Sequence, residues 1–219
     1  MLFGKTVLLC VLGGTLGMFA LPASAQKGKK EPSLAAAPGA YTKQEIDAEF
    51  IEALQEKLIG NTKISLTLFG AFIKKYPDVA AGHFEFGELS VAIGIYSQAL
   101  PAYQRAVELE PKNKWYLVGL AELYDFLKMY KESKDVYKKL SELYPTELEF
   151  AISAVSILVQ EGKLPEAIGL LDKIEQQIGV TADINLEKYR LYMAQKKYTE
   201  ALAELAKLQA QYPNETLYM

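Results

Sequence analysis

The chain has 219 residues and a formal net charge of -3, with 50% hydrophobic and 23% charged residues. That composition is typical of a globular protein with one or two packed domains. With 15 glycines, 9 prolines and one cysteine, the sequence excludes collagen, disorder throughout and a disulfide scaffold. A slightly acidic chain has no general attraction to phosphates, so we expect no nucleic acid partner.

Residues 1–25 predict an export signal. Lys5 supplies a basic start, and the apolar run 6–21 is shorter than the roughly 20 residues that span a bilayer. Ala23-Ser24-Ala25 has the small-x-small pattern of a cleavage site. We therefore expect cleavage after Ala25, loss of Cys10 with the signal, and a periplasmic or secreted protein without a membrane span.

An uncleaved membrane anchor is the alternative interpretation of this segment. Lys27, Lys29 and Lys30 follow the apolar run and outnumber Lys5, which is opposite to the usual charge bias of a cleaved signal. Residues 26–42 are rich in lysine, proline, glycine and alanine and predict a flexible leader.

A repeat of 34 residues organises the rest of the chain. Tyr-Pro pairs recur at twice this period, and so do a small and a bulky residue at every period. The pairs begin at Tyr76, Tyr144 and Tyr212, the small series is Ala99, Ser133, Ala167 and Ala201, and the bulky series is Tyr103, Tyr137, Leu171 and Leu205. This period predicts five units, 46–79, 80–113, 114–147, 148–181 and 182–215.

Each unit divides into two helical halves. In the third unit, apolar residues recur at i, i+3, i+4 and i+7, namely at Leu117, Leu120, Ala121 and Tyr124. Prolines stand near the ends of most units, where a helix has to stop. Alternating β patterns are scarce, so an all-α fold is expected.

The pattern resembles the tetratricopeptide repeat family, in which a small residue, a bulky residue, an apolar residue and a proline recur in order. The matching positions are Ala99, Tyr103, Ala106 and Pro111, and again Ala201, Leu205, Leu208 and Pro213. The resemblance implies a right-handed superhelical solenoid of about five antiparallel helix pairs over residues 43–215, with 216–219 beginning a further repeat. Residues 101–123 are also similar to exported repeat proteins of Bacteroidetes-type bacteria.

No enzymatic chemistry is predicted. His83 is the only histidine, and a metal site or a Ser-His-Asp triad needs partners that this chain does not offer once Cys10 is removed. We interpret His83 as a packing residue, and a metal ligand is the weaker alternative. We expect no catalytic residue, no metal and no cofactor.

The resemblance places four positions of each unit on a concave face, the second, fifth, ninth and twelfth. These positions combine apolar residues with acids. The predicted partner-binding groove consists of Phe84, Glu88, Trp115, Val118, Glu122, Asp125 and Ile152. The alternative also stands: the apolar members pack against neighbouring helices, and the acids only solvate the face.

Two functions follow from these observations. The first is an exported, non-catalytic scaffold that binds a protein or peptide segment carrying apolar side chains with nearby Lys or Arg. The second is the recruiting or sensory repeat region of a larger enzyme or receptor, of which this chain would be a fragment.

Overall fold

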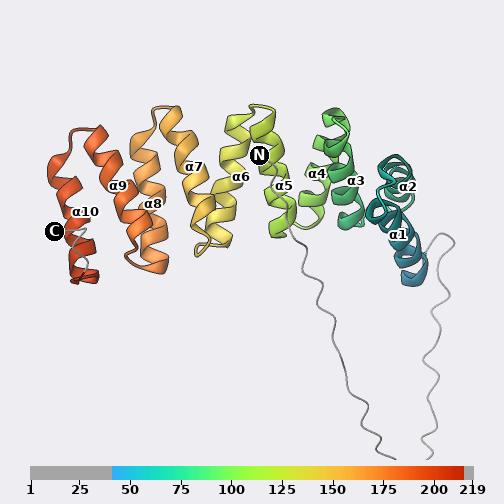
Figure 1. Ribbon diagram of the computed structural model, residues 1–219, viewed down its shortest axis with the longest axis horizontal. Coiled ribbons are helices and arrows are strands. Elements are labelled where there is room, and N and C mark those ends of the chain that lie inside the picture. The colour runs from blue at the N-terminus through green and yellow to red at the C-terminus, as the bar shows by residue number, and fades with distance from the viewer. Residues whose placement is uncertain (1–40, 215–219) are drawn as a thin grey trace, which may run out of the picture. The chain divides into compact units, whose positions relative to one another are not determined.

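The computed structural model describes residues 41–214, and within them ten α-helices follow one another as antiparallel pairs (Figure 1). The helices are α1 Lys43–Leu58, α2 Thr62–Lys75, α3 Ala80–Ala92, α4 Tyr96–Leu109, α5 Lys114–Phe126, α6 Tyr130–Leu143, α7 Leu148–Gln160, α8 Leu164–Ile178, α9 Ala182–Ala194 and α10 Tyr198–Gln211. From the second pair on, each pair begins at the first residue of a predicted unit. The predicted all-α array of about five helix pairs is therefore confirmed.

The odd-numbered helices, here called the first helices, alternate with the even-numbered second helices. Each helix packs mainly against the helices before and after it in the chain, and Figure 1 shows the pairs following one another from α1 to α10. No pair has a large core of its own, so each helix pair depends on its neighbours for burial.

The small and bulky series explain how closely the helices pack. Ala99, Ala167 and Ala201 are fully buried, and Tyr103 and Leu171 fill the space beside them. A small side chain lets two helix axes approach to about 8–10 Å, and a large one fills the gap that remains between layers. The predicted role of these two series is confirmed, although Leu205 is only partly buried.

Ion pairs and a cap support the acidic first helix of the array. Thr42 and Glu45 form a capping box at the start of α1. Glu49 lies 2.5 Å from Lys75 Nζ and accepts a hydrogen bond from the Tyr76 hydroxyl at 2.9 Å. These contacts with the end of α2 allow the glutamates of α1 to sit on a helix that otherwise buries few residues.

The same turn joins the two helices of every pair. The residue after each helix cap has a left-handed backbone, with φ between 59° and 87°. The next residue then donates its N–H to the carbonyl five positions back, at 2.8–3.0 Å. This is the Schellman geometry, which glycine adopts without a steric cost. Glycine occupies it at positions 60, 94 and 162, whereas Lys128 and Lys196 occupy it in the third and fifth pairs.

A buried cluster of charges joins the last three helices. Lys188 on α9 is 1% exposed, and its Nζ lies 2.6 Å from Asp172, 2.7 Å from Glu175 and 3.0 Å from Glu204. The amide nitrogen of Asn185 donates to both glutamates, each at 2.7 Å. Sequence analysis missed this cluster.

Burial alone would lower the pKa of Lys188, but hydrogen bonds to the three carboxylates outweigh it and raise this pKa. The opposite balance applies to Glu175. Burial would raise its pKa, but hydrogen bonds from Lys188 and Asn185 lower it. The cluster therefore keeps its charges at neutral pH.

His83 is buried on α3, and its Nε2 lies 2.9 Å from the Pro77 carbonyl oxygen. The ring therefore has the structural position that we expected. The predicted signal, its cleavage site, most of the leader and residues 216–219 lie outside the described residues. Within residues 41–214, no helix has the length and apolarity needed to cross a bilayer.

Candidate functional site on the first helices

Three pockets lie in succession between neighbouring first helices. The α3–α5 pocket has a volume of about 370 Å³, the α5–α7 pocket about 390 Å³ and the α7–α9 pocket about 380 Å³. We call the surface that they share the first-helix face. A further pocket of about 530 Å³ adjoins α2, but its lining residues include no carboxylate.

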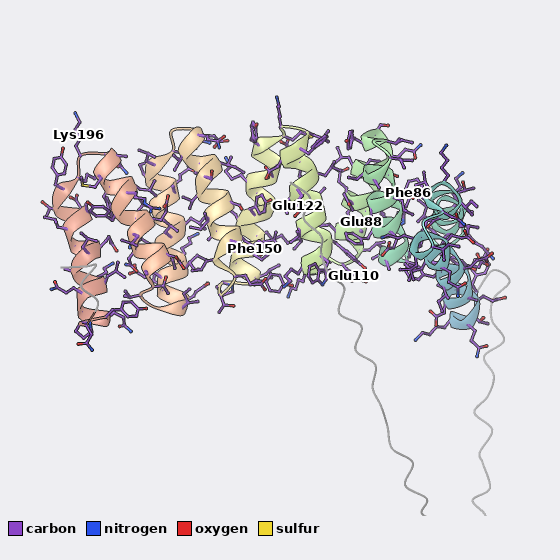
Figure 2. All side chains as sticks on the ribbon, in the orientation of Figure 1. Phe86, Glu88, Glu110, Glu122, Phe150 and Lys196 are labelled. Carbon is purple, nitrogen blue, oxygen red and sulfur yellow. The ribbon has the colours of Figure 1, made fainter. Side chains whose placement is uncertain are left out.

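The α3–α5 pocket combines aromatic rings with carboxylates. Phe126, at the end of α5, packs against Tyr96, at the start of α4, with ring centroids 4.7 Å apart. Glu88 and Glu122 line the same pocket from α3 and α5, and Figure 2 shows them on these adjacent first helices. Gly119 leaves room between the helices, because a Cβ there would lie 3.1 Å from the Phe84 ring.

A buried tyrosine holds one of these carboxylates in place. The Tyr103 hydroxyl donates a hydrogen bond to Glu88 Oε1. Burial first, and the hydrogen bond to Glu88 second, raise the pKa of Tyr103 above its ordinary value. The hydroxyl therefore keeps its proton and orients the Glu88 carboxylate at the pocket wall.

The other two pockets share an exposed apolar residue and have different charges. Ile152 is 38% exposed and lines both of them. In the α5–α7 pocket, Asp125 accepts a hydrogen bond from the Ser133 hydroxyl at 2.5 Å. The α7–α9 pocket contains Glu149 and Asp183 together with an internal pair, Arg190 and Glu187, at 3.0 Å.

The structure distributes the seven predicted groove residues between pockets and packing contacts. Glu88 and Glu122 line the α3–α5 pocket, while Asp125 and Ile152 line the pockets that follow. These four lie along one row of pockets.

The remaining three lie outside the linings of these pockets. Phe84 is half-buried, with its ring centroid 5.5 Å from that of Tyr103 and 4.9 Å from that of Tyr116. Val118 packs against the central hydrophobic core. Trp115 is 65% exposed, with Lys114 Nζ 5.0 Å from its ring centroid. The packing alternative therefore describes Phe84 and Val118 better than Trp115.

Sequence reasoning missed two aromatic walls, Tyr96 and Phe126. Phe126 is at the thirteenth position of its unit, next to the twelfth position that the resemblance marked. Tyr96 belongs to a second helix, and its periodic recurrence with Tyr130 and Tyr198 was the available signal. In the part of the chain that the structure describes, no group of three or more His, Cys, Asp or Glu is placed to hold a metal.

Three models of the tetratricopeptide repeat family match the chain, at residues 59–114, 116–147 and 190–215. Together they cover more than half of its length. The chain is a tetratricopeptide repeat protein. The two helix pairs that these models leave wholly or partly unmatched, α1–α2 and α7–α8, follow the same pattern in the structure.

Solved structures of low sequence identity share this fold. The repeat protein YrrB, whose structure is described as having an unusual peptide-binding site, superposes with a TM-score of 0.54 at 17% identity over 82% of this chain and 96% of its own. A MamA structure gives 0.57 at 12%, over 81% and 97%. MamA of Desulfovibrio magneticus RS-1 gives 0.53 at 10%, over 80% and 99%.

Among curated proteins, none matches this chain. The matches found support the repeat family and its fold. They give no support to the similarity with exported proteins of Bacteroidetes-type bacteria, which stays a prediction.

Proposed function

We propose that this repeat protein is a non-catalytic scaffold that binds a partner segment along the first-helix face. The observation that carries the proposal is the row of three pockets, which are lined by apolar side chains and by six carboxylates against one guanidinium. Tetratricopeptide repeats generally serve as protein interaction modules, and the description of YrrB as a peptide-binding repeat protein is consistent with this use of the fold.

The chemistry of the face defines the partner. Apolar side chains of the partner would enter pockets of this size and supply most of the affinity, at roughly 25 cal/mol per Å² of buried apolar surface before ordering costs. The carboxylates favour Lys or Arg beside those apolar groups, and they chiefly increase the association rate and the selectivity. An apolar and basic segment is therefore the expected ligand.

A peptide array tests this function. The purified chain is probed with immobilised peptides in which apolar residues are combined with Lys and Arg, with Glu, or with neutral residues. Peptides selected from the array are then measured in solution. We expect selection of the basic apolar class and weaker binding as salt increases, since exposed charges are screened over about 8–10 Å at ordinary ionic strength.

Two pairs of variants locate the binding. Glu122→Lys should slow association, whereas Glu142→Lys, an exposed change on the second helix α6, should leave it unchanged. Ile152→Ala should speed dissociation, whereas Leu202→Ala on α10 should not. If Glu122→Lys and Ile152→Ala bind the selected peptides as the parent does while circular dichroism shows intact folds, the first-helix face is not the site.

Export is the second part of the proposal. The short apolar run and Ala23-Ser24-Ala25 support delivery of the scaffold to the periplasm or the exterior, with Gln26 as the first residue. N-terminal sequencing of the protein from the cell envelope should read from Gln26. An intact Met1 in the membrane fraction would instead identify the anchor.

A further inference from the structure

We infer that the α3–α5 pocket is the subsite for an arginine side chain of the partner segment. This inference rests on the proposed function and assigns a specific chemistry to one of its three pockets. The pocket brings together two kinds of group that recognise a guanidinium. Aromatic faces attract the cation, and carboxylates accept its N–H groups.

The aromatic wall is accessible and firmly held. Phe126 is 62% exposed, although its ring packs against Tyr96 on the adjoining helix. One ring therefore supports the other, while much of Phe126 remains available to a ligand. A guanidinium within about 6 Å of an aromatic centroid is attracted to the ring face, and its planar shape also allows stacking.

The carboxylates stand on the two helices that form the pocket. Glu88 uses Oε1 to accept the Tyr103 hydroxyl, and its Oε2 has no hydrogen-bond partner among residues 41–214. Glu122 lines the pocket from α5. A guanidinium has five N–H donors in a rigid fork, so it can reach two carboxylates at once, whereas a lysine ammonium behaves as a point charge.

The neighbouring pockets lack this combination. In the α5–α7 pocket the only carboxylate, Asp125, already accepts the Ser133 hydroxyl. The α7–α9 pocket has several carboxylates but no aromatic wall, and Arg190 of this chain is already part of its lining. Of these three pockets, only the one between α3 and α5 has two or more aromatic rings together with two carboxylates.

A pair of small probes tests the assignment. N-acetylarginine N-methylamide is titrated into the full chain, and its citrulline counterpart, which has nearly the same shape without the charge, serves as the control ligand. Amide NMR shifts of Gly119 and Leu123, both in the pocket lining, report the occupancy. We expect saturable shifts with the arginine probe, and binding at least about tenfold weaker with citrulline and weaker with lysine.

Variants separate the charge contribution from the aromatic contribution. Glu88→Gln with Glu122→Gln should abolish the saturable shifts, and the single change Glu122→Gln, which leaves the Tyr103 contact intact, should reduce affinity. Phe126→Leu keeps an apolar wall and should weaken binding roughly two- to fivefold through loss of the cation–π contact. Glu149→Gln, in the α7–α9 pocket, is the matched control and should bind as the parent does.

The inference is overturned if citrulline or lysine binds as well as arginine, if the double variant retains binding, or if the shifts map outside the α3–α5 pocket. These results are distinguishable from failure of the proposed function. If basic apolar peptides bind the first-helix face while the arginine probe has no effect at Gly119, the scaffold stands and the subsite is wrong. If array peptides also fail to bind, both are wrong.

Discussion

At the scale of single residues, the turns inside the repeats show an unequal use of glycine. The left-handed position after the first helix is glycine in three of the five pairs, but Lys128 and Lys196 occupy it in the other two. A residue with a Cβ pays a steric cost in this conformation, because the Cβ approaches the following carbonyl oxygen. These two lysines therefore store a small amount of strain.

Replacing either lysine by glycine should stabilise the array. For Lys128→Gly, relief of about 1–2 kcal/mol of steric cost exceeds the roughly 0.5–1 kcal/mol of added unfolded-state entropy. Urea unfolding measures the change in free energy. Lys173→Gly, at an exposed position within α8, is the control and should lose about 1 kcal/mol. A loss of stability in Lys128→Gly would contradict this account of the turn.

Two helical glycines make a second comparison, because they differ in what surrounds them. A Cβ on Gly87 would lie 2.8 Å from the Tyr103 ring, whereas a Cβ on Gly169 would meet no atom within 4 Å. Alanine favours a helix over glycine, so Gly169→Ala should gain about 0.5–1 kcal/mol. Gly87→Ala should lose roughly 1–3 kcal/mol through overpacking against a rigid ring. Thermal melts of the two variants should move in opposite directions.

At the scale of elements, the Lys188 cluster makes the packing of α8, α9 and α10 sensitive to pH. The pKa of Glu175 is lowered in the folded protein, so its contribution to stability is present above its unfolded value and lost as pH falls through the folded value. The relevant range lies below about pH 5, since an unperturbed glutamate titrates near 4.3.

Glu175→Gln tests this contribution. The difference in unfolding free energy between the parent and the variant should be largest near neutral pH and shrink on acidification, when the parent carboxylate also becomes neutral. Denaturant titrations at a series of pH values measure it. Glu142→Gln, on α6, provides a comparison with an exposed glutamate. A parent–variant difference that is constant from pH 7 to about pH 3 would exclude the linkage.

The helix pairs were predictable because their information is periodic. The same small and bulky positions recur in each unit, and Ala99 and Ala167 are buried as that recurrence predicts. The Lys188 cluster was not predictable, because its four charged groups come from three helices and none belongs to a repeated series. Their contacts depend on side-chain directions after packing, which a period of 34 residues does not encode.

The candidate site was predictable in part for the same reason. The family positions identified Glu88 and Glu122, which line a pocket, because the first helices all present the same face. They did not separate Phe84, whose ring packs between two tyrosines, from residues that line a pocket. Nor did they identify Phe126, since its place beside Tyr96 depends on the geometry of the neighbouring turn.

At the scale of the whole repeat array, stability should be coupled mainly between neighbours. Ala167→Trp introduces a large ring at a fully buried position of α8 and should cost about 1–3 kcal/mol or more. Because each pair leans on the next, amide exchange should speed up in α6–α10 more than in α1–α4. Uniform loss of protection along the array would show all-or-none unfolding, and an unchanged midpoint would remove Ala167 from the helix contact.

The ion pairs between repeats have a consequence for the kinetics of folding. Lys114 reaches Glu147, Lys134 reaches Glu161 and Lys57 reaches Glu85, so each links one unit to the next. Among the described residues, the hydrogen bonds join partners no more than 33 positions apart. Such a low contact order requires little loop closure, so the array can assemble rapidly, one unit on another, as the chain emerges from a ribosome or a membrane pore.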